Sequence, residues 1–172
     1  MLIVQGKYLT CHYDSIAKMK CVLVLDNIRS VENVGSIFRT AESFGVEKVV
    51  LVGITPAPVD RFGRKRKDLA KVALGREDRV LWEKVEDVLS IISLLKDEDY
   101  QILALEQDKR SVRLRDFKAE EKFALIVGNE VEGISKSVLD QVDKILEIPM
   151  TGESESLNVS VATGVALFHL CN

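Results

Sequence analysis

Short apolar runs alternate with amphipathic segments along the chain. Runs rich in aliphatic and β-branched residues predict strands at 21–25, 48–52, 79–82, 100–105, 123–127 and 145–148. Between them, apolar residues recur every three or four positions, which predicts helices over 34–44, 67–74, 85–95, 135–142 and 159–170. Most of the strands are apolar throughout, as strands covered on both faces must be. The order predicts an α/β fold with a mostly parallel sheet and helices on both faces.

The chain of 172 residues, 47% of them apolar, fits a single domain. No apolar run reaches the roughly 20 residues that cross a bilayer, and the first residues do not resemble a secretory signal. Cys11, Cys21 and Cys171 are odd in number and form no CxxC pair, which disfavours a disulfide framework or a zinc site. We therefore expect a soluble cytoplasmic domain without a metal, in which His12 and His169 are structural.

Positive charge gathers in one stretch of a chain whose net charge is −3. Between residues 61 and 79, eight basic residues stand against three acidic ones. Such a patch suits a phosphate backbone, and it is equally compatible with an ordinary solvated face.

In parallel sheets, ligands bind beyond the carboxyl ends of the strands, and polar segments follow three of the predicted strands. The first, residues 26–40, leads into a helix for which Asn33 is the expected N-cap. Arg39 lies off the apolar stripe of this helix. It is compatible with a surface arginine paired with Glu42 or Ser43, or with a guanidinium directed at a phosphate beside Asn33.

The second segment places Gly128-Asn129-Glu130 and Gly133 directly after a buried strand. Glycine permits a sharp turn and a close ligand, but the spacing matches neither a P-loop nor a dinucleotide fingerprint. Carboxylates here would repel a pyrophosphate and suit a cationic or amine-bearing cofactor. The alternative is an ordinary strand-to-helix turn capped by Ser135.

The third segment, residues 148–166, leads into the last helix, which Ser156 or Asn158 is suited to cap. This helix is apolar nearly all round, and Gly164 in its middle costs about 1 kcal/mol relative to alanine. Small residues allow another backbone to approach closely, which indicates either a crowded core or a subunit interface.

Together, in order, the three segments resemble the three motifs of the SpoU (TrmH) family of RNA ribose 2′-O-methyltransferases, within the SPOUT superfamily. The matching residues are Asn33-x-Gly35-x-x-x-Arg39-Thr40, then Gly128-Asn129-Glu130-x-x-Gly133-Ile134-Ser135, then Ile148-Pro149-Met150 with Ser156-Leu157-Asn158-Val159-Ser160-Val161-Ala162. The resemblance runs from about residue 21 to the C-terminus. It implies a homodimer and a C-terminal trefoil knot, with residues 1–20 as an N-terminal extension and about 120–172 as the knotted cofactor-binding region of a single domain.

The resemblance also implies roles for particular residues. S-adenosylmethionine would bind bent in the knot, against Leu105, Glu106, Gly128, Ile148, Met150 and Leu157. Arg39 would hold the phosphate beside the target ribose. Whether Arg39 also acts as general base stays open, because a guanidinium that remains protonated near neutral pH is a poor base. The pocket around the reacting atoms would be shaped by Asn33, Glu130, Ser156 and Asn158.

About twenty residues precede the first predicted strand, so we expect the catalytic domain itself to hold tRNA or rRNA. The expected RNA contacts are Arg61, Arg64, Lys65, Arg66, Lys67 and Lys71. Two other interpretations stay open: a knotted RNA-binding dimer without catalysis, and an unrelated flavodoxin-like domain, which no glycine fingerprint supports. Trp82 is expected in the core.

Overall fold

The computed structural model describes residues 19–153 and 156–172. Its strands are β1 (Lys20–Asp26), β2 (Lys48–Val52), β3 (Leu81–Val85), β4 (Gln101–Leu105), β5 (Val112–Arg113), β6 (Lys122–Val127) and β7 (Lys144–Glu147). Its helices are α1 (Val31–Ser43), α2 (Lys67–Ala73), α3 (Val88–Asp97), α4 (Lys136–Leu139) and α5 (Val159–Leu170). Two short 3-10 turns are η1 (Arg76–Asp78) and η2 (Leu114–Asp116).

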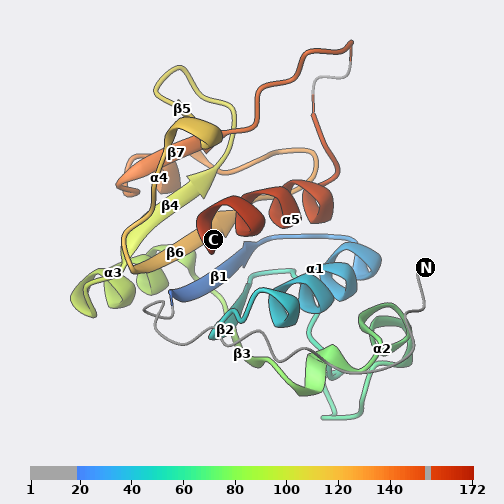
Figure 1. Ribbon diagram of the computed structural model, residues 1–172. Helices are drawn as coiled ribbons and strands as arrows, with labels where there is room; N and C mark the ends of the chain where they lie inside the picture. The colour runs from blue at the N-terminus through green and yellow to red at the C-terminus, as the bar shows by residue number, and fades with distance from the viewer. Residues whose placement is uncertain (1–18, 154–155) are drawn as a thin grey trace, which may run out of the picture.

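The described strands form one sheet in the order β3-β2-β1-β6-β4-β7-β5, and every neighbouring pair is parallel. Helices cover both of its faces (Figure 1). Because side chains alternate along a strand, β1 supplies two separate cores. Leu23 and Leu25 pack with α1, α2 and α5, whereas Val22 and Val24 pack with α3 and α4. The predicted α/β class is confirmed.

Several element boundaries differ from the prediction. The third strand begins two residues late, because η1 and the residues after it occupy 76–80. Helix α3 begins at Val88 rather than 85, since the Asp87 carboxylate caps it by accepting from the backbone N–H groups of Leu89 and Ser90. Helix α4 is a single turn. Strand β5 is two exposed residues long, too short to leave a recognisable pattern.

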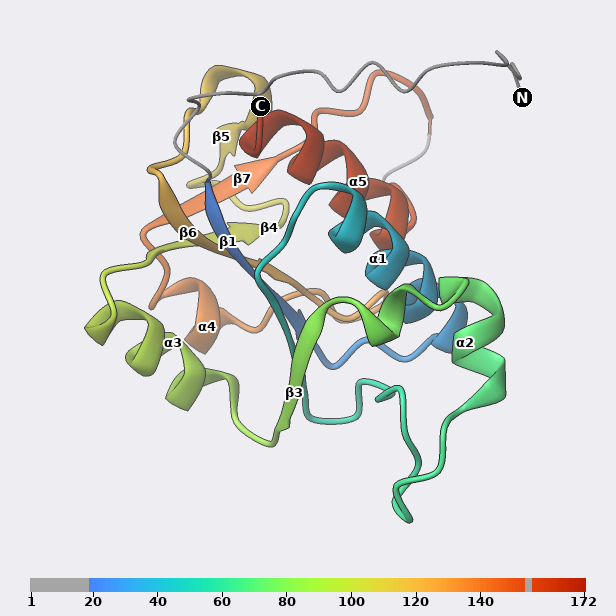
Figure 2. The same cartoon turned by 60° about the horizontal axis from the view of Figure 1, so that its bottom comes forward.

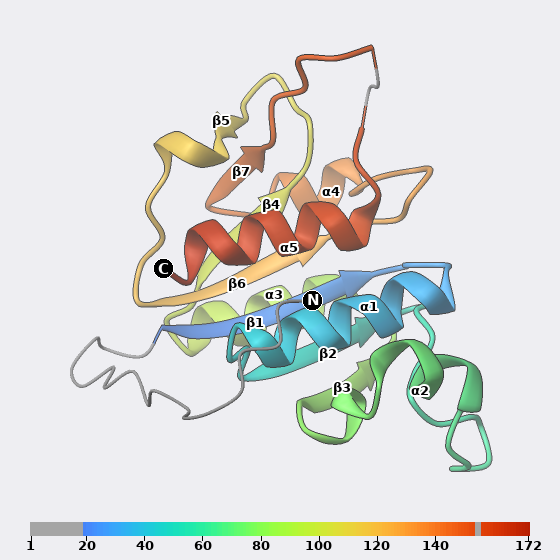
Figure 3. The ribbon, with the colours of Figure 1, turned by 45° about the vertical axis from the view of Figure 1, so that its right-hand side comes forward.

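The last helix returns across the molecule. Strand β7 lies next to β4, yet α5, which follows it in the chain, packs against α1 over the middle of the sheet (Figure 3). The described residues of the connection, 148–153 and 156–158, lie at the carboxyl edge of the sheet, where β4, β6 and β7 end. The threading of this segment into a knot stays a prediction.

Candidate active site at the carboxyl edge of the sheet

The turn after β1 is held by a buried threonine. Thr55, 1% exposed, donates from Oγ1 to the carbonyl of Leu25 at 2.9 Å and accepts from the N–H of Ile28 at 3.0 Å. These bonds satisfy backbone groups at the point where the chain leaves the sheet. The turn that carries the first motif is thereby fixed to the loop after β2.

Ser30, and not Asn33, caps α1. The Ser30 hydroxyl accepts from the backbone N–H of Asn33 at 3.1 Å, and the helix begins at Val31. The sequence prediction was wrong because both residue types cap helices well and the apolar stripe does not distinguish the two positions. Because Ser30 is the cap, Asn33 lies in the first helical turn. Its side-chain amide is therefore available to bond residues of the candidate site.

Asn129 organises the turn after β6. Its Oδ1 accepts from the N–H groups of Val131 and Glu132 at 2.9 and 3.1 Å, and its Nδ2 donates to the carbonyl of Asn27 at 2.8 Å. The side chain thus shapes its own loop and joins it to the turn after β1. Sequence reasoning gave Asn129 no role, although asparagine after a strand is a known builder of such turns.

The same loop closes tightly on itself at two glycines. A Cβ added at Gly128 would lie 2.5 Å from Ile134 Cγ1 and 2.7 Å from the carbonyl carbon of Gly133, and Gly133 itself has φ +67°. The Glu106 carboxylate completes the closure by accepting from the N–H of Ile134 at 2.9 Å. Side chains at either glycine would force the loop open.

One hydrogen-bonded chain joins all three motifs. Asn158, which caps α5, donates from Nδ2 to Asn33 Oδ1 at 3.0 Å, and Asn33 donates from Nδ2 to Glu130 Oε1 at 2.9 Å. Glu130 also accepts from the N–H groups of Arg29 and Ser30 at 3.0 and 3.2 Å. Residues more than ninety positions apart are therefore held in contact at one point of the surface.

Glu130 is the anionic centre of this network. Partial burial works to raise the pKa of Glu130, but the donors from Arg29, Asn33 and Ser30 outweigh it and leave the pKa below its ordinary value. Because the folded state favours the ionised form, this stabilisation is present above the ordinary glutamate value of 4.5 and is lost as the pH falls through the lowered value.

We expect Glu130→Gln to lower the free energy of unfolding at pH 7 by about 1 kcal/mol or less, since solvent screens the lost bonds. Urea unfolding curves measure the loss, which shrinks below pH 4.5 as the wild-type carboxylate becomes protonated. Glu132→Gln is the matched control in the same loop, because the Glu132 carboxylate has no hydrogen bond within the described residues. An equal, pH-independent loss in both variants would contradict the role of Glu130.

A cavity of about 670 Å³ lies beside the network, between the turns after β4, β6 and β7 and the segment that enters α5. Its walls include every residue expected to bind the cofactor, namely Leu105, Glu106, Gly128, Ile148, Met150 and Leu157. Glu130, Ser156 and Asn158 also line it. Asn33 is bonded to Glu130 and Asn158 but does not itself line the cavity, and neither does Arg39.

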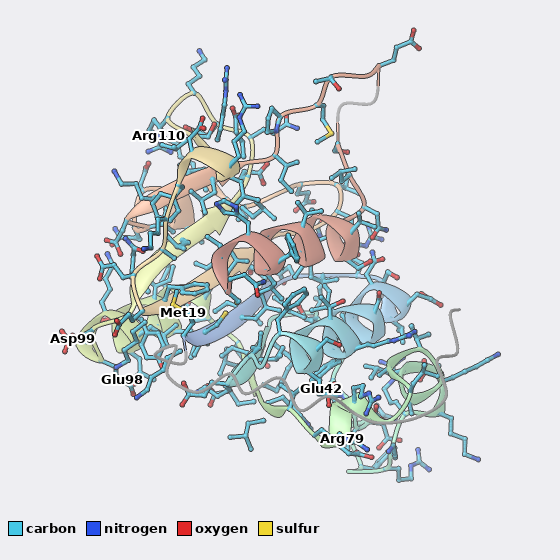
Figure 4. The ribbon with its side chains drawn as sticks, viewed as in Figure 1. Met19, Glu42, Arg79, Glu98, Asp99 and Arg110 are labelled. Carbon is cyan, nitrogen blue, oxygen red and sulfur yellow. The ribbon has the colours of Figure 1, made fainter. Side chains whose placement is uncertain are left out.

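Arg39 is exposed on α1, and its guanidinium has no hydrogen bond or ion pair with the described residues. The expected alternative partner, Glu42, instead lies 3.7 Å from both Arg76 and Arg79. Glu42 and Arg79 are labelled in Figure 4. Ser43 bonds only the backbone carbonyl of Arg39. Helical side chains lean toward the N-terminus of their helix, so Arg39 leans toward the end of α1 that carries Asn33, about 9 Å along the axis.

Half of the basic residues expected to contact RNA are already paired with carboxylates. Arg64 lies 2.7 Å from Asp60, Arg66 lies 2.6 Å from Asp68, and Lys65 contacts Glu77 and Asp78. The other three, Arg61, Lys67 and Lys71, have no ion pair within the described part of the chain. None of the six lines the cavity, so the structure separates this surface from the site.

A second cavity of about 550 Å³ opens where β1 and β2 end. Asp26, Arg29 and Val88 line it, and Asn129 contributes to both cavities. Burial raises the pKa of Asp26, which is 5% exposed. Sequence reasoning did not anticipate this cavity.

The remaining candidates contribute no site. His169 Nε2 lies 2.8 Å from the carbonyl oxygen of Phe117, and Trp82 is partly buried against the core. Cys11 and His12 lie outside the described residues. Across 19–153 and 156–172, no three potential ligands gather around a possible metal position. No helix in that same part of the chain has the length and apolarity to cross a membrane.

Comparison with known proteins decides the family. The model of the SpoU rRNA Methylase family matches residues 20–168. The chain belongs to this family. Among its relatives is the tRNA (guanosine(18)-2′-O)-methyltransferase of Aquifex aeolicus (strain VF5), 32% identical over 147 residues, which cover 86% of this chain and 66% of that protein.

Solved structures of RNA-modifying proteins resemble this one. An AdoMet-bound rRNA methyltransferase from Sinorhizobium meliloti has a TM-score of 0.79 at 25% identity, over 88% of this chain and 56% of that one. A second structure, which concerns the 2-OH methylation of C/U34 on tRNA, has a TM-score of 0.71 at 25% identity. The match covers 88% of this chain and 93% of that one. The chain spans about three fifths of several curated relatives, such as 58% of one from Staphylococcus haemolyticus (strain JCSC1435).

Proposed function

We propose that this SpoU-family protein transfers a methyl group from S-adenosylmethionine to the 2′-hydroxyl of a ribose in tRNA or rRNA. One observation carries the proposal: a single cavity gathers all six residues expected to bind the cofactor beside the chain Asn158–Asn33–Glu130. The Sinorhizobium structure was solved with AdoMet, and the Aquifex relative is named for 2′-O-methylation of a tRNA guanosine.

The residues of the cavity fit this cofactor. Glu106, Glu130, Glu132 and Glu147 line it, a set that favours a sulfonium and an ammonium group and disfavours phosphates. Apolar side chains of Leu105, Ile148 and Leu157 offer surface for an adenine ring. Gly128 also lines the cavity, and because it has no side chain, Ile134 and Gly133 pack directly against it and complete this wall.

Bound S-adenosylmethionine supplies a methyl group that is already activated by its sulfonium charge. The protein's task is to align the ribose oxygen with this methyl group. Such positioning lowers the activation barrier by several kcal/mol. Asn158 lines the cavity, and the bonds from Asn158 to Asn33 and from Asn33 to Glu130 fix the orientation of both amides beside it. Arg39 holds the neighbouring phosphate. Glu130, whose pKa is lowered, is a weak base and serves to orient Asn33.

We also propose that the chain forms a single domain with a C-terminal trefoil knot. The placement of α5 beside α1, although it follows β7 on the other side of the sheet, supports this proposal. A knot there would fix residues 148–150 and 156–158 against the loop 128–135 and so hold the cavity walls together.

A homodimer through α5 is part of the same proposal. Val161, Val165 and Phe168 form one exposed apolar stripe on this helix, and Phe168 is 65% exposed. A Cβ at Gly164 would meet only Thr40 Cγ2 at an ordinary 3.7 Å, so packing within the subunit does not require glycine there. The small residues of α5 are therefore better explained by a second subunit than by a crowded core.

Val165→Glu is expected to convert the dimer into a monomer, because it places a charge in the middle of this stripe. Light scattering after size exclusion measures the change, from twice the 19.2 kDa chain mass to once that mass. Leu81→Glu is the control. Leu81 is also exposed, at 70%, but it lies on the edge strand β3 and not on α5, which carries the proposed interface. A wild-type protein that elutes as a monomer would overturn the dimer.

The activity is tested by incubating the protein with labelled S-adenosylmethionine and total tRNA or rRNA, and then digesting the RNA to nucleosides. The proposal predicts label in 2′-O-methylated nucleosides. Label only on bases would contradict it. Tight binding of the cofactor without transfer to any RNA would instead favour the RNA-binding dimer without catalysis.

A further inference from the structure

The connection between β2 and α2 projects from the body of the molecule (Figure 2). Its tip is a small hairpin in which Val59 and Lys65 form an antiparallel bridge, and the Asp60 N–H donates to the carbonyl of Arg64 at 2.9 Å. Asp60 Oδ1 accepts from the N–H groups of Phe62 and Arg64 at 2.8 and 3.0 Å. The tip is therefore held in one shape by its own hydrogen bonds.

Phe62 stands at this tip with two guanidinium groups against its ring. It is 65% exposed, and the Cζ atoms of Arg61 and Arg64 lie 4.8 and 5.0 Å from the ring centroid. The two arginines differ in freedom. Arg64 is fixed by Asp60, whose pKa the Arg64 guanidinium holds below its ordinary value, whereas Arg61 has no ion pair among the described residues.

We propose that the hairpin of residues 59–65 is a stacking platform for an unpaired base of the RNA substrate. This inference rests on the proposed RNA methylation. A base stacks on the Phe62 ring when Arg61 swings aside, and the Arg61 guanidinium then meets a flanking phosphate while Arg64 stays paired with Asp60. The occupant is unpaired, since bases inside duplex RNA are stacked on both faces and leave an aromatic ring no face to stack on except at the ends of the duplex.

The surroundings of the hairpin favour RNA over an apolar protein partner. Burying Phe62 in a protein would also strip water from the two guanidiniums beside it, a cost that phosphates offset. Two further cations without described ion pairs, Lys67 and Lys71, come after the hairpin in the chain and stand four residues apart on α2. Helix α2 packs on α1, the helix that carries Arg39. These cations mark a route for the RNA backbone from the hairpin to α1.

Fluorescence anisotropy tests this with a labelled single strand of about 12 nucleotides and with the same sequence in duplex form. Phe62→Leu keeps an apolar side chain but removes the ring, and should weaken single-strand binding about tenfold with little change for the duplex. Phe62→Trp should retain the affinity and show fluorescence quenching beyond that of Trp82 in the wild type. Leu81→Ala, which truncates another exposed apolar side chain, should bind like the wild type.

The outcomes separate this inference from the proposed function. Unchanged single-strand binding by Phe62→Leu, in a protein that methylates RNA, would overturn the platform and leave the function intact. Phe62-dependent binding without methyl transfer would support the platform while the function fails. Equal loss of single-strand and duplex binding in Phe62→Leu would also overturn it, because a base-stacking role affects only the single strand.

Discussion

Arg39→Ala is expected to lower kcat/KM for methyl transfer at least 100-fold, with the affinity for S-adenosylmethionine and the melting temperature unchanged. Removing one positioned electrostatic group from a reacting centre typically costs about 10²–10³ in rate. Arg39 lies outside the cavity and makes no described contact that supports the fold, so its loss should leave donor binding and folding alone. Steady-state kinetics, calorimetry and thermal unfolding measure the three quantities.

Two further substitutions sharpen this test. Arg39→Lys retains the charge but loses the planar fork that grips a phosphate with two hydrogen bonds, and should recover only part of the activity. Arg115→Ala removes an arginine on η2 whose described ion pair, with the adjacent Asp116, is long at 3.7 Å, and should be as active as the wild type. Full activity in Arg39→Ala would show that the phosphate is held elsewhere.

Gly128→Ala is expected to weaken S-adenosylmethionine binding at least tenfold. The new Cβ would overlap Ile134 and the backbone of Gly133, so the loop that forms one wall of the cavity must move. Such overpacking costs about 1–3 kcal/mol, and one tenfold change in affinity corresponds to about 1.4 kcal/mol. Isothermal titration calorimetry measures the effect.

Gly152→Ala is the matched control, because its Cβ would meet nothing within 4 Å. It should bind the donor as the wild type does. If Gly128→Ala bound the donor with wild-type affinity and wild-type stability, the tight closure of residues 128–134 would not determine the shape of the site.

The sequence predicts the central strands best. Strands β1, β2 and β6 occur within one residue of their apolar runs, because burial on both faces leaves an unbroken pattern. Strand β5 could not be predicted, since two exposed residues carry no such pattern. The cap of α1 was misplaced because Ser30 and Asn33 are both good capping residues and only the folded turn selects one.

The candidate site, too, was predictable from the sequence only in part. Periodicity does not reveal that β4, β6 and β7 end side by side, and the cofactor residues were found through the resemblance of three motifs. The bond from Asn158 to Asn33 spans 125 positions and has no local signature. Nor does composition show that Arg64, Lys65 and Arg66 are paired with nearby carboxylates, which weakens an inference drawn from the number of charges alone.

The most direct test of the account is a crystal structure of the protein with S-adenosylmethionine. It should show the donor against Leu105, Gly128 and Leu157, with its methyl group directed toward Asn33 and Glu130. A donor bound in the second cavity, beside Asp26 and Val88, would contradict the proposed site.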